Sequence, residues 1–182
     1  MTHVDLIDPN VATGDRGALL AEINAAFGTT PAMFRATANS TAALRSMWGS
    51  FGALGNGVLP AQLIEQLAVA IADRNGCSYC LAAHTALGRK AGVSREQLAA
   101  AQTGHSDDPR TAAVLRFALA IVEERGAVPA DVVAAVRDAG LSEEEIVEVI
   151  AHVALNLFTN YLNVALDVPV DFPSVQLSTA GV

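Results

Sequence analysis

Residues 65–92 read EQLAVAIADRNGCSYCLAAHTALGRKAG, and this stretch decides how the chain folds. The segment over residues 60–75 has apolar side chains at helical spacing and begins with a proline, which suits the first turn of a helix. Asn75 and Gly76 form a strong stop signal, because both residue types adopt the left-handed conformation that ends helices. A second helix is expected over residues 77–91. The stretch therefore predicts two helices joined by a tight turn.

Four side chains of this stretch form a chemical pattern. The only two cysteines of the chain, Cys77 and Cys80, share one face of the first turn of the second helix. Backbone N–H groups at that end have no partner within the helix, and the helix dipole is positive there, so both effects favour a thiolate. His84 follows one turn after Cys80, and antiparallel packing of the helices would bring the carboxylate of Glu65 near His84. A carboxylate that orients a histidine, which in turn deprotonates a thiol, is the arrangement of an activated nucleophile.

The spacing of these residues resembles the core motif of the alkyl hydroperoxidase D / carboxymuconolactone decarboxylase family, and the likeness extends over about residues 31–166. The resemblance implies that Cys80 attacks a hydroperoxide and that Cys77 then resolves the oxidised Cys80. It assigns a proton relay to His84 and Glu65. It also implies an all-helical subunit that forms homo-oligomers, trimers or hexamers, and that uses an external dithiol reductant without a bound cofactor.

One position departs from the family pattern. The best-known peroxidase members have a histidine directly before the second cysteine, whereas this chain has Tyr79. The activation of Cys77 therefore stays open at this point. The two cysteines are nevertheless expected to form a reversible disulfide, because their α-carbons should lie about 5–6 Å apart, within disulfide reach.

The composition is that of a folded and self-associating protein. The 182 residues suffice for one compact domain, and a hydrophobic content of 52% against 16% charged residues favours an oligomer. A net charge of −8 argues against nucleic acids and anionic membranes as partners. The chain has no apolar run of about eighteen residues, and its first residues lack the features of a signal peptide. We therefore expect a cytoplasmic protein without a membrane span, in which so close a cysteine pair is redox-active rather than structural.

The remainder of the chain also has helical patterns. Ser94 and Ser142 each begin a capping box, in which Gln or Glu follows the serine three residues later, and Asp15 is expected to cap the first helix. No convincing strand is found, which argues against a thioredoxin-like setting of the C-x-x-C motif. We predict an all-α fold, a single helical bundle over residues 1–182 with an irregular N-terminal lead and an extended C-terminal tail. Besides the motif pair and a short helix after Pro31, helices are expected over about residues 15–27, 40–54, 94–102, 110–125, 129–139 and 142–166.

A weak internal repeat of a helix pair is also visible. An offset of 82 residues places Tyr79 on Tyr161, and the same helical face is apolar in both copies. The two cysteines fall on a threonine and a leucine, so only one copy holds thiol chemistry.

The cysteine pair also fits two other interpretations. A zinc site would take both cysteines and His84 as ligands, but it needs a fourth ligand from His105, His152 or an acid. The cysteines could also be small buried hydrophobes beside an unrelated histidine. We predict no bound metal.

Several polar and aromatic residues outside the motif also stand out. His152 lies in an apolar helical segment, where a hydrogen-bonded core histidine is expected. Trp48 and Phe51 are expected in the core or at a subunit interface. Three asparagines at roughly one-turn spacing either line a polar cleft or bond to the backbone and to partner subunits, and we assign them no catalytic role: Asn156, Asn160 and Asn163.

The leading functional hypothesis is a thiol peroxidase that reduces hydroperoxides and is regenerated by an external dithiol. A second enzymatic hypothesis is the decarboxylase branch of the same family, whose members act on a lactone acid without a cysteine pair. A third is a non-enzymatic oligomeric protein whose dithiol senses redox state. Peroxide turnover that depends on Cys80 would separate the first hypothesis from the other two.

Overall fold

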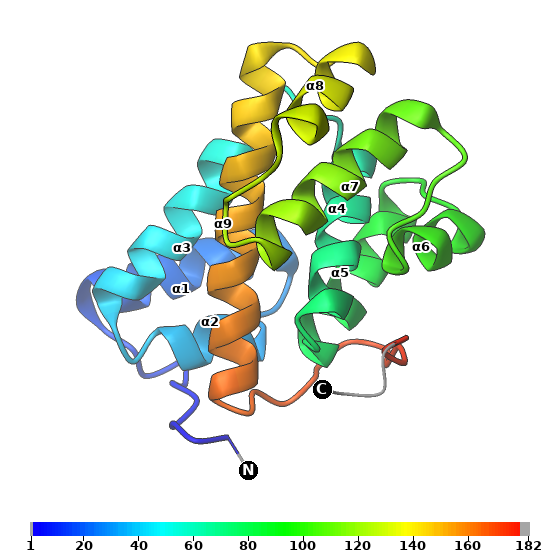
Figure 1. Cartoon of the computed structure of the whole chain (residues 1–182). Helices are drawn as coiled ribbons and strands as arrows, with labels where there is room; N and C mark the ends of the chain where they lie inside the picture. The colour runs from blue at the N-terminus through cyan, green and yellow to red at the C-terminus, as the bar shows by residue number, and fades with distance from the viewer. Residues whose placement is uncertain (1, 179–182) are drawn as a thin grey trace.

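The computed structural model describes residues 2–178, and within this range the chain forms nine α-helices and no strand (Figure 1). This architecture confirms the all-α prediction. The helices are α1 (Gly14–Phe27), α2 (Ala32–Thr37), α3 (Thr41–Leu54), α4 (Ala61–Arg74), α5 (Ser78–Lys90), α6 (Arg95–Gln102), α7 (Pro109–Glu123), α8 (Ala130–Asp138) and α9 (Glu143–Ala165).

The helix starts follow the local signals of the sequence in most cases. Ser94 and Ser142 both form complete capping boxes, at the starts of α6 and α9. Ser40 caps α3 through its side chain, which accepts a hydrogen bond from the backbone of the third residue of the helix. The expectation for Asp15 was wrong. It lies in the first turn of α1 rather than before it, and its carboxylate instead pairs with Arg45 at 2.6 Å.

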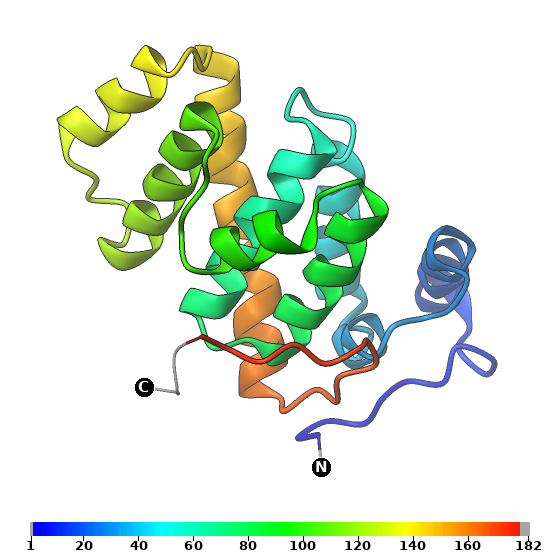
Figure 2. The same cartoon turned by 90° about the vertical axis from the view of Figure 1, so that its right-hand side faces the viewer.

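The long helix α9 is the central element of the fold. It packs against α2, α3, α4, α5 and α7. In Figure 1 it runs, in orange, between α1–α3 on one side and α4–α7 on the other. Figure 2, turned by 90°, shows the same separation of the N-terminal helices from the α7–α8 pair. Residues on α9 are therefore placed to reach side chains from both halves of the chain.

Buried apolar side chains form two clusters, and α4 contributes to both. One cluster joins α1, α2 and α3 to α5 and includes Phe34 together with Val69 of α4. The other joins α7, α8 and α9 and includes Leu115 together with Leu67 of α4. Full burial of such a side chain contributes roughly 1.5–3 kcal/mol to folding. Because α4 is packed on both sides, the position of Glu65 on this helix is closely determined.

The turn between α4 and α5 has the conformation that the sequence predicts. Gly76 has a φ of 65°, in the left-handed region, and the backbone N–H of Cys77 donates to the carbonyl of Ala72 at 2.9 Å. The side chain of Asn75 donates to Oδ1 of Asn160 on α9 at 3.0 Å. The turn is thus held both by its own backbone and by a contact with the central helix.

The segment after α9 forms no helix in its described part and lies across α2, α4 and α5. Asp171 accepts a hydrogen bond from the backbone of Ala32 at 2.6 Å, and Phe172 packs edge-on against Tyr79. Further along, the backbone of Ser178 donates to Asp73 at 2.8 Å. This agrees with the extended tail expected from the sequence.

The internal repeat does not correspond to a second helix pair. The segment that the offset of 82 residues aligns with α4 and α5 is the single uninterrupted helix α9 and the start of the C-terminal segment. Leu157 and Phe158 occupy the places of Asn75 and Gly76, and neither favours a left-handed turn. The offset therefore aligns apolar faces but not helix boundaries.

None of the helices among residues 2–178 has the length and hydrophobicity that a membrane crossing requires.

Candidate active site

The cysteine pair lies at the start of α5. Cys77 and Cys80 are joined as a disulfide with their α-carbons 5.4 Å apart, within the range expected from their spacing. Cys77 is the N-cap residue of α5, and its sulfur accepts a hydrogen bond from the backbone N–H of Cys80 at 3.2 Å. Both residues are almost fully buried. Whether the disulfide is reversible stays a prediction.

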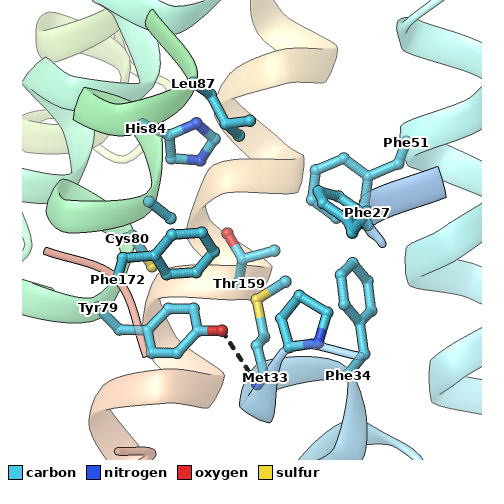
Figure 3. Close-up of a pocket in the computed structure, with 12 residues that line it drawn as sticks. Phe27, Met33, Phe34, Phe51, Tyr79, Cys80, His84, Leu87, Thr159 and Phe172 are labelled. Carbon is cyan, nitrogen blue, oxygen red and sulfur yellow. Dashed lines mark hydrogen bonds between the residues drawn. The ribbon is translucent and has the colours of Figure 1, made fainter. Parts of the chain in front are cut away.

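Only one of the two cysteines lines a cavity. Cys80 borders a small cavity of about 40 Å³, and Cys77 is not among the residues that line it. Figure 3 shows Cys80 and His84 on one side of this cavity, with Phe27, Phe34 and Phe51 on the opposite side. The other lining residues are Pro31, Met33, Tyr79, Ala83, Leu87, Thr159 and Phe172. Of the two cysteines, Cys80 is therefore the one that borders the space at this site.

Glu65 and His84 form the contact that antiparallel packing of α4 and α5 predicts. Oε2 of Glu65 lies 2.8 Å from Nδ1 of His84, and both side chains are largely buried. A carboxylate can only accept, so Nδ1 is the donor, and in a neutral imidazole Nε2 is then free to accept a proton. Gly88 allows the close approach of the helices, because a Cβ there would lie 3.3 Å from Cβ of Glu65 and nearer still to Leu98.

The central helix supplies a site residue that sequence reasoning missed. Asn163 of α9 is 3% exposed, and its Nδ2 donates to Sγ of Cys80 at 3.2 Å. A donor in this position stabilises negative charge on the sulfur. The available signal was the one-turn spacing of three asparagines in the second half of this helix. One of them, Asn160, instead holds the turn before α5.

Tyr79, which departs from the family pattern, is a structural residue. Its hydroxyl accepts a hydrogen bond from the backbone of Met33 at 3.3 Å, and its ring packs edge-on against Phe172 (Figure 3). Burial is the main cause of a pKa for Tyr79 that lies well above its usual value. The phenol therefore stays protonated near neutral pH and does not replace the family's histidine as a proton carrier.

A larger cavity of about 380 Å³ lies beside the small one. The two share five lining residues: Phe27, Phe51, His84, Leu87 and Thr159. The larger cavity is also bordered by Glu65 and by two polar residues of α9, His152 and Asn156. Trp48 lies in its wall, in contact with the rings of Phe27 and Phe34. None of the described residues that line either cavity is lysine or arginine.

The expectation of a satisfied core histidine at position 152 was wrong. His152 is only 4% exposed, yet its Nε2 has no hydrogen-bond partner. Burial is the main cause of a lowered pKa for this imidazole, which the carboxylate of Glu148 partly opposes. His105 is exposed and lies near Thr103, away from the cysteines. Among residues 2–178, no cluster of three or more His, Cys, Asp or Glu side chains is arranged to hold a metal ion.

The sequence profile of the carboxymuconolactone decarboxylase family matches residues 31–124, about half of the chain. No match was found among curated proteins.

Solved structures share the fold over nearly the whole chain, at identities that support the fold alone. A peroxidase-related protein with an alkylhydroperoxidase AhpD core from Ralstonia eutropha JMP134 has a TM-score of 0.84 at 21% identity, covering 93% of this chain and 92% of that one. A peroxidase-related protein from Silicibacter sp. TM1040 has a TM-score of 0.79 at 20% identity, covering 92% and 91%. The debrominase Bmp8, as its C82A variant with 2,3,4-tribromopyrrole, has a TM-score of 0.76 at 20% identity, covering 94% of each chain. By its profile match, which the helical fold supports, this chain belongs to the carboxymuconolactone decarboxylase family.

Proposed function

We propose that the protein is a dithiol peroxidase of the alkyl hydroperoxidase type, with Cys80 as the residue that attacks the peroxide. One observation carries the proposal. Cys80 and His84 border the same small cavity, and Oε2 of Glu65 lies 2.8 Å from Nδ1 of that imidazole. This arrangement supports Cys80 as the nucleophile, His84 as the base and Glu65 as the carboxylate that orients it.

The first step oxidises Cys80. Its thiolate attacks the terminal oxygen of a hydroperoxide, the O–O bond breaks, and the sulfur becomes a sulfenic acid. The departing alkoxide takes a proton from His84 and leaves as an alcohol. His84 receives this proton earlier, when it deprotonates the thiol of Cys80, so the proton count balances. Glu65 keeps Nε2 of the imidazole turned towards the cavity.

The second step regenerates the thiols. The Cys77 thiolate attacks the sulfur of the sulfenic acid, a disulfide forms, and hydroxide leaves and is protonated to water. An external dithiol then exchanges with the disulfide and is itself oxidised. Overall, one hydroperoxide and one dithiol give one alcohol, one water and one disulfide of the reductant, which is a two-electron reduction.

The decarboxylase alternative fits the cavities less well. Its substrate is a lactone acid, which carries a carboxylate, whereas the described lining of the two cavities includes Glu65 and no lysine or arginine. An anion would therefore meet a carboxylate without a compensating cation. The redox-sensor alternative uses the same disulfide but predicts no turnover.

A second candidate function is reductive dehalogenation of a halogenated aromatic ring. The observation that favours it is the aromatic lining of the cavities next to Cys80, which includes Phe27, Trp48 and Phe51. A dithiol can supply the two electrons that replace carbon–bromine by carbon–hydrogen, with release of bromide and formation of the disulfide. This resembles the activity named for the debrominase with the same fold.

The deciding experiment measures consumption of hydrogen peroxide and of cumene hydroperoxide with dithiothreitol as reductant. We expect turnover by the wild type and no turnover above background by Cys80→Ser. The matched control is Cys77→Ser, which in the absence of any added thiol, dithiothreitol included, should consume one equivalent of peroxide, form the sulfenic acid and then stop. Bromide release from 2,3,4-tribromopyrrole without peroxide turnover would instead favour the dehalogenase. Equal peroxide consumption by wild type and Cys80→Ser would contradict the proposal.

A further inference from the structure

Four buried polar atoms of α9 have no hydrogen-bond partner, and two of them belong to residues that line the larger cavity. These two are Nε2 of His152 and Oδ1 of Asn156, and each residue is 4% exposed. Buried polar groups in folded proteins are nearly always paired, because an unpaired one loses its contacts with water and gains nothing in return. The cavity offers room for a partner that is not part of the chain.

Neighbouring side chains do not satisfy these two atoms. Nδ2 of Asn156 donates to the backbone carbonyl of His152 at 2.9 Å, which fixes the orientation of the amide, so the free atom is an acceptor. The carboxylate nearest to His152 is Glu148, at 3.8 Å, too far for a hydrogen bond. Its two oxygens already accept from the backbone N–H groups of Val58 and Leu59, both at 2.9 Å.

The remaining lining determines what kind of molecule fits. Its volume of about 380 Å³ lies within the range of small-molecule pockets. Its walls are mainly apolar and aromatic: Phe27, Trp48, Phe51, Leu54, Ile64, Leu87 and Leu155. Its charged group is the carboxylate of Glu65, and no described lining residue is a lysine or arginine. Such a lining suits a neutral molecule with an apolar body and disfavours an anion.

We propose that this cavity binds the organic body of the substrate, and that His152 and Asn156 recognise a hydroxyl or N–H group on it. That group donates to Oδ1 of Asn156 and contacts Nε2 of His152. The identity of the reacting group rests on the proposed function, in which the peroxide group reaches the small cavity at Cys80. The larger cavity adjoins that small cavity, and the two share His84 and Thr159. The substrate class is a neutral, apolar hydroperoxide with a second polar group remote from the peroxide.

Binding can be measured without any turnover. The chain has one tryptophan, Trp48, and it lies in the wall of the cavity, so its fluorescence reports occupancy. The probes are 4-isopropylbenzyl alcohol and 4-isopropylbenzoate, which share a skeleton and differ in the polar group. We expect the alcohol to quench the fluorescence of Trp48 in a saturable way. The dissociation constant of the benzoate should be at least about tenfold higher than that of the alcohol, a difference that corresponds to roughly the loss of one hydrogen bond.

Two variants test the contact with His152 and the cavity itself, and a third serves as the control. His152→Leu should raise the dissociation constant of the alcohol about tenfold, with an unchanged or higher melting temperature, because an apolar side chain replaces an unpaired buried one. Gly52→Leu should abolish binding by filling the cavity, since Gly52 borders it and an added Cβ meets nothing within 4 Å. The matched control is His105→Leu, an exposed histidine elsewhere, which should leave the affinity unchanged.

The outcomes separate this inference from the proposed function. Equal affinity of wild type and His152→Leu for the alcohol would overturn the inference, as would tighter binding of the benzoate. A lower melting temperature of His152→Leu with unchanged affinity would show that the histidine is structural, and would also overturn it. Hydrogen peroxide turnover without alcohol binding would reject the inference alone. Alcohol binding that depends on His152 in a protein without peroxide turnover would reject the peroxidase alone.

Discussion

The α4–α5 pair and the central helix α9 have similar apolar faces, but the pair is interrupted by a turn and α9 is continuous. α4 and α5 are two short helices separated by the turn at Asn75 and Gly76, whereas α9 runs without a break from Glu143 to Ala165. The break creates a helix N-terminus, and the cysteine pair lies there. The unbroken helix has no such end near the site and instead contributes polar side chains from its middle and last turns. One region therefore holds the reactive groups, and the other surrounds them.

The two regions also differ in what they expose. No large apolar side chain of α4 or α5 is exposed, whereas α9 exposes five: Val147, Ile150, Phe158, Tyr161 and Val164. Their spacing of three to eight residues places them along one side of the helix. We refer to these five residues as the α9 stripe.

The strongest test of the comparison targets the relay within α4 and α5. Glu65→Gln and His84→Phe should each lower peroxide turnover by about 10²–10⁴-fold, the usual loss when acid–base help is removed. The control is Glu144→Gln, an exposed carboxylate on α9, which should have no effect. Steady-state peroxide consumption with dithiothreitol measures all three. Unchanged turnover in His84→Phe would mean that the contact between Glu65 and His84 is structural only.

The α9 stripe leads to a prediction about self-association. We expect the protein to form homo-oligomers through this face, and Tyr161→Glu to raise the dissociation constant about 30-fold or more, as expected for an aromatic residue at the centre of an interface. Sedimentation equilibrium would follow the shift towards the monomer mass of 18.8 kDa. Gln62→Glu adds a charge to the exposed surface of α4 and should leave the mass unchanged. A wild type that is monomeric at micromolar concentration would contradict this prediction.

A smaller effect is expected where α9 meets the cysteine pair. Asn163→Leu removes the donor to the sulfur of Cys80, and a hydrogen bond to a charged group contributes about 1.5–3 kcal/mol. The thiolate is then disfavoured, so the midpoint of the alkylation rate of Cys80 against pH should move upwards by about one to two pH units. The control is Asn156→Leu, because the structure records no contact between the neighbouring Asn156 and the sulfur of Cys80. The same midpoint in wild type and Asn163→Leu would show that α9 does not tune the thiol.

The smallest effect is expected at the break itself. Gly76→Ala should lower the free energy of unfolding by about 1–2 kcal/mol, because a side chain is disfavoured at a φ of 65° even though a Cβ there meets nothing within 4 Å. Gly49→Ala, in the exposed interior of α3, should change stability in the opposite direction, by about 0.5–1 kcal/mol. Urea denaturation of both variants measures the two values. Equal changes in the free energy of unfolding of the two variants would show that the left-handed conformation of Gly76 is not the cause of the destabilisation.

Much of the site was accessible from the sequence because it depends on local rules. The stop at Asn75 and Gly76 and the two cysteines lie close together in the chain, so their arrangement follows from backbone preferences and helical geometry alone. The contact of Glu65 with His84 needed one further assumption, that consecutive helices joined by a tight turn pack antiparallel. The helix starts at Ser94 and Ser142 were equally local.

The helical segments, the positions of the thiols and the family resemblance of the motif all followed from the sequence alone. The tertiary structure was needed to show that Asn163 contacts Cys80 from a helix more than 80 residues away, and that Nε2 of His152, a residue beside the larger cavity, is buried without a partner. The physical reason is that helix boundaries follow from interactions between near neighbours in the chain. Cavities and unpaired buried atoms follow instead from how whole helices pack, which the spacing of residues on one helix does not specify.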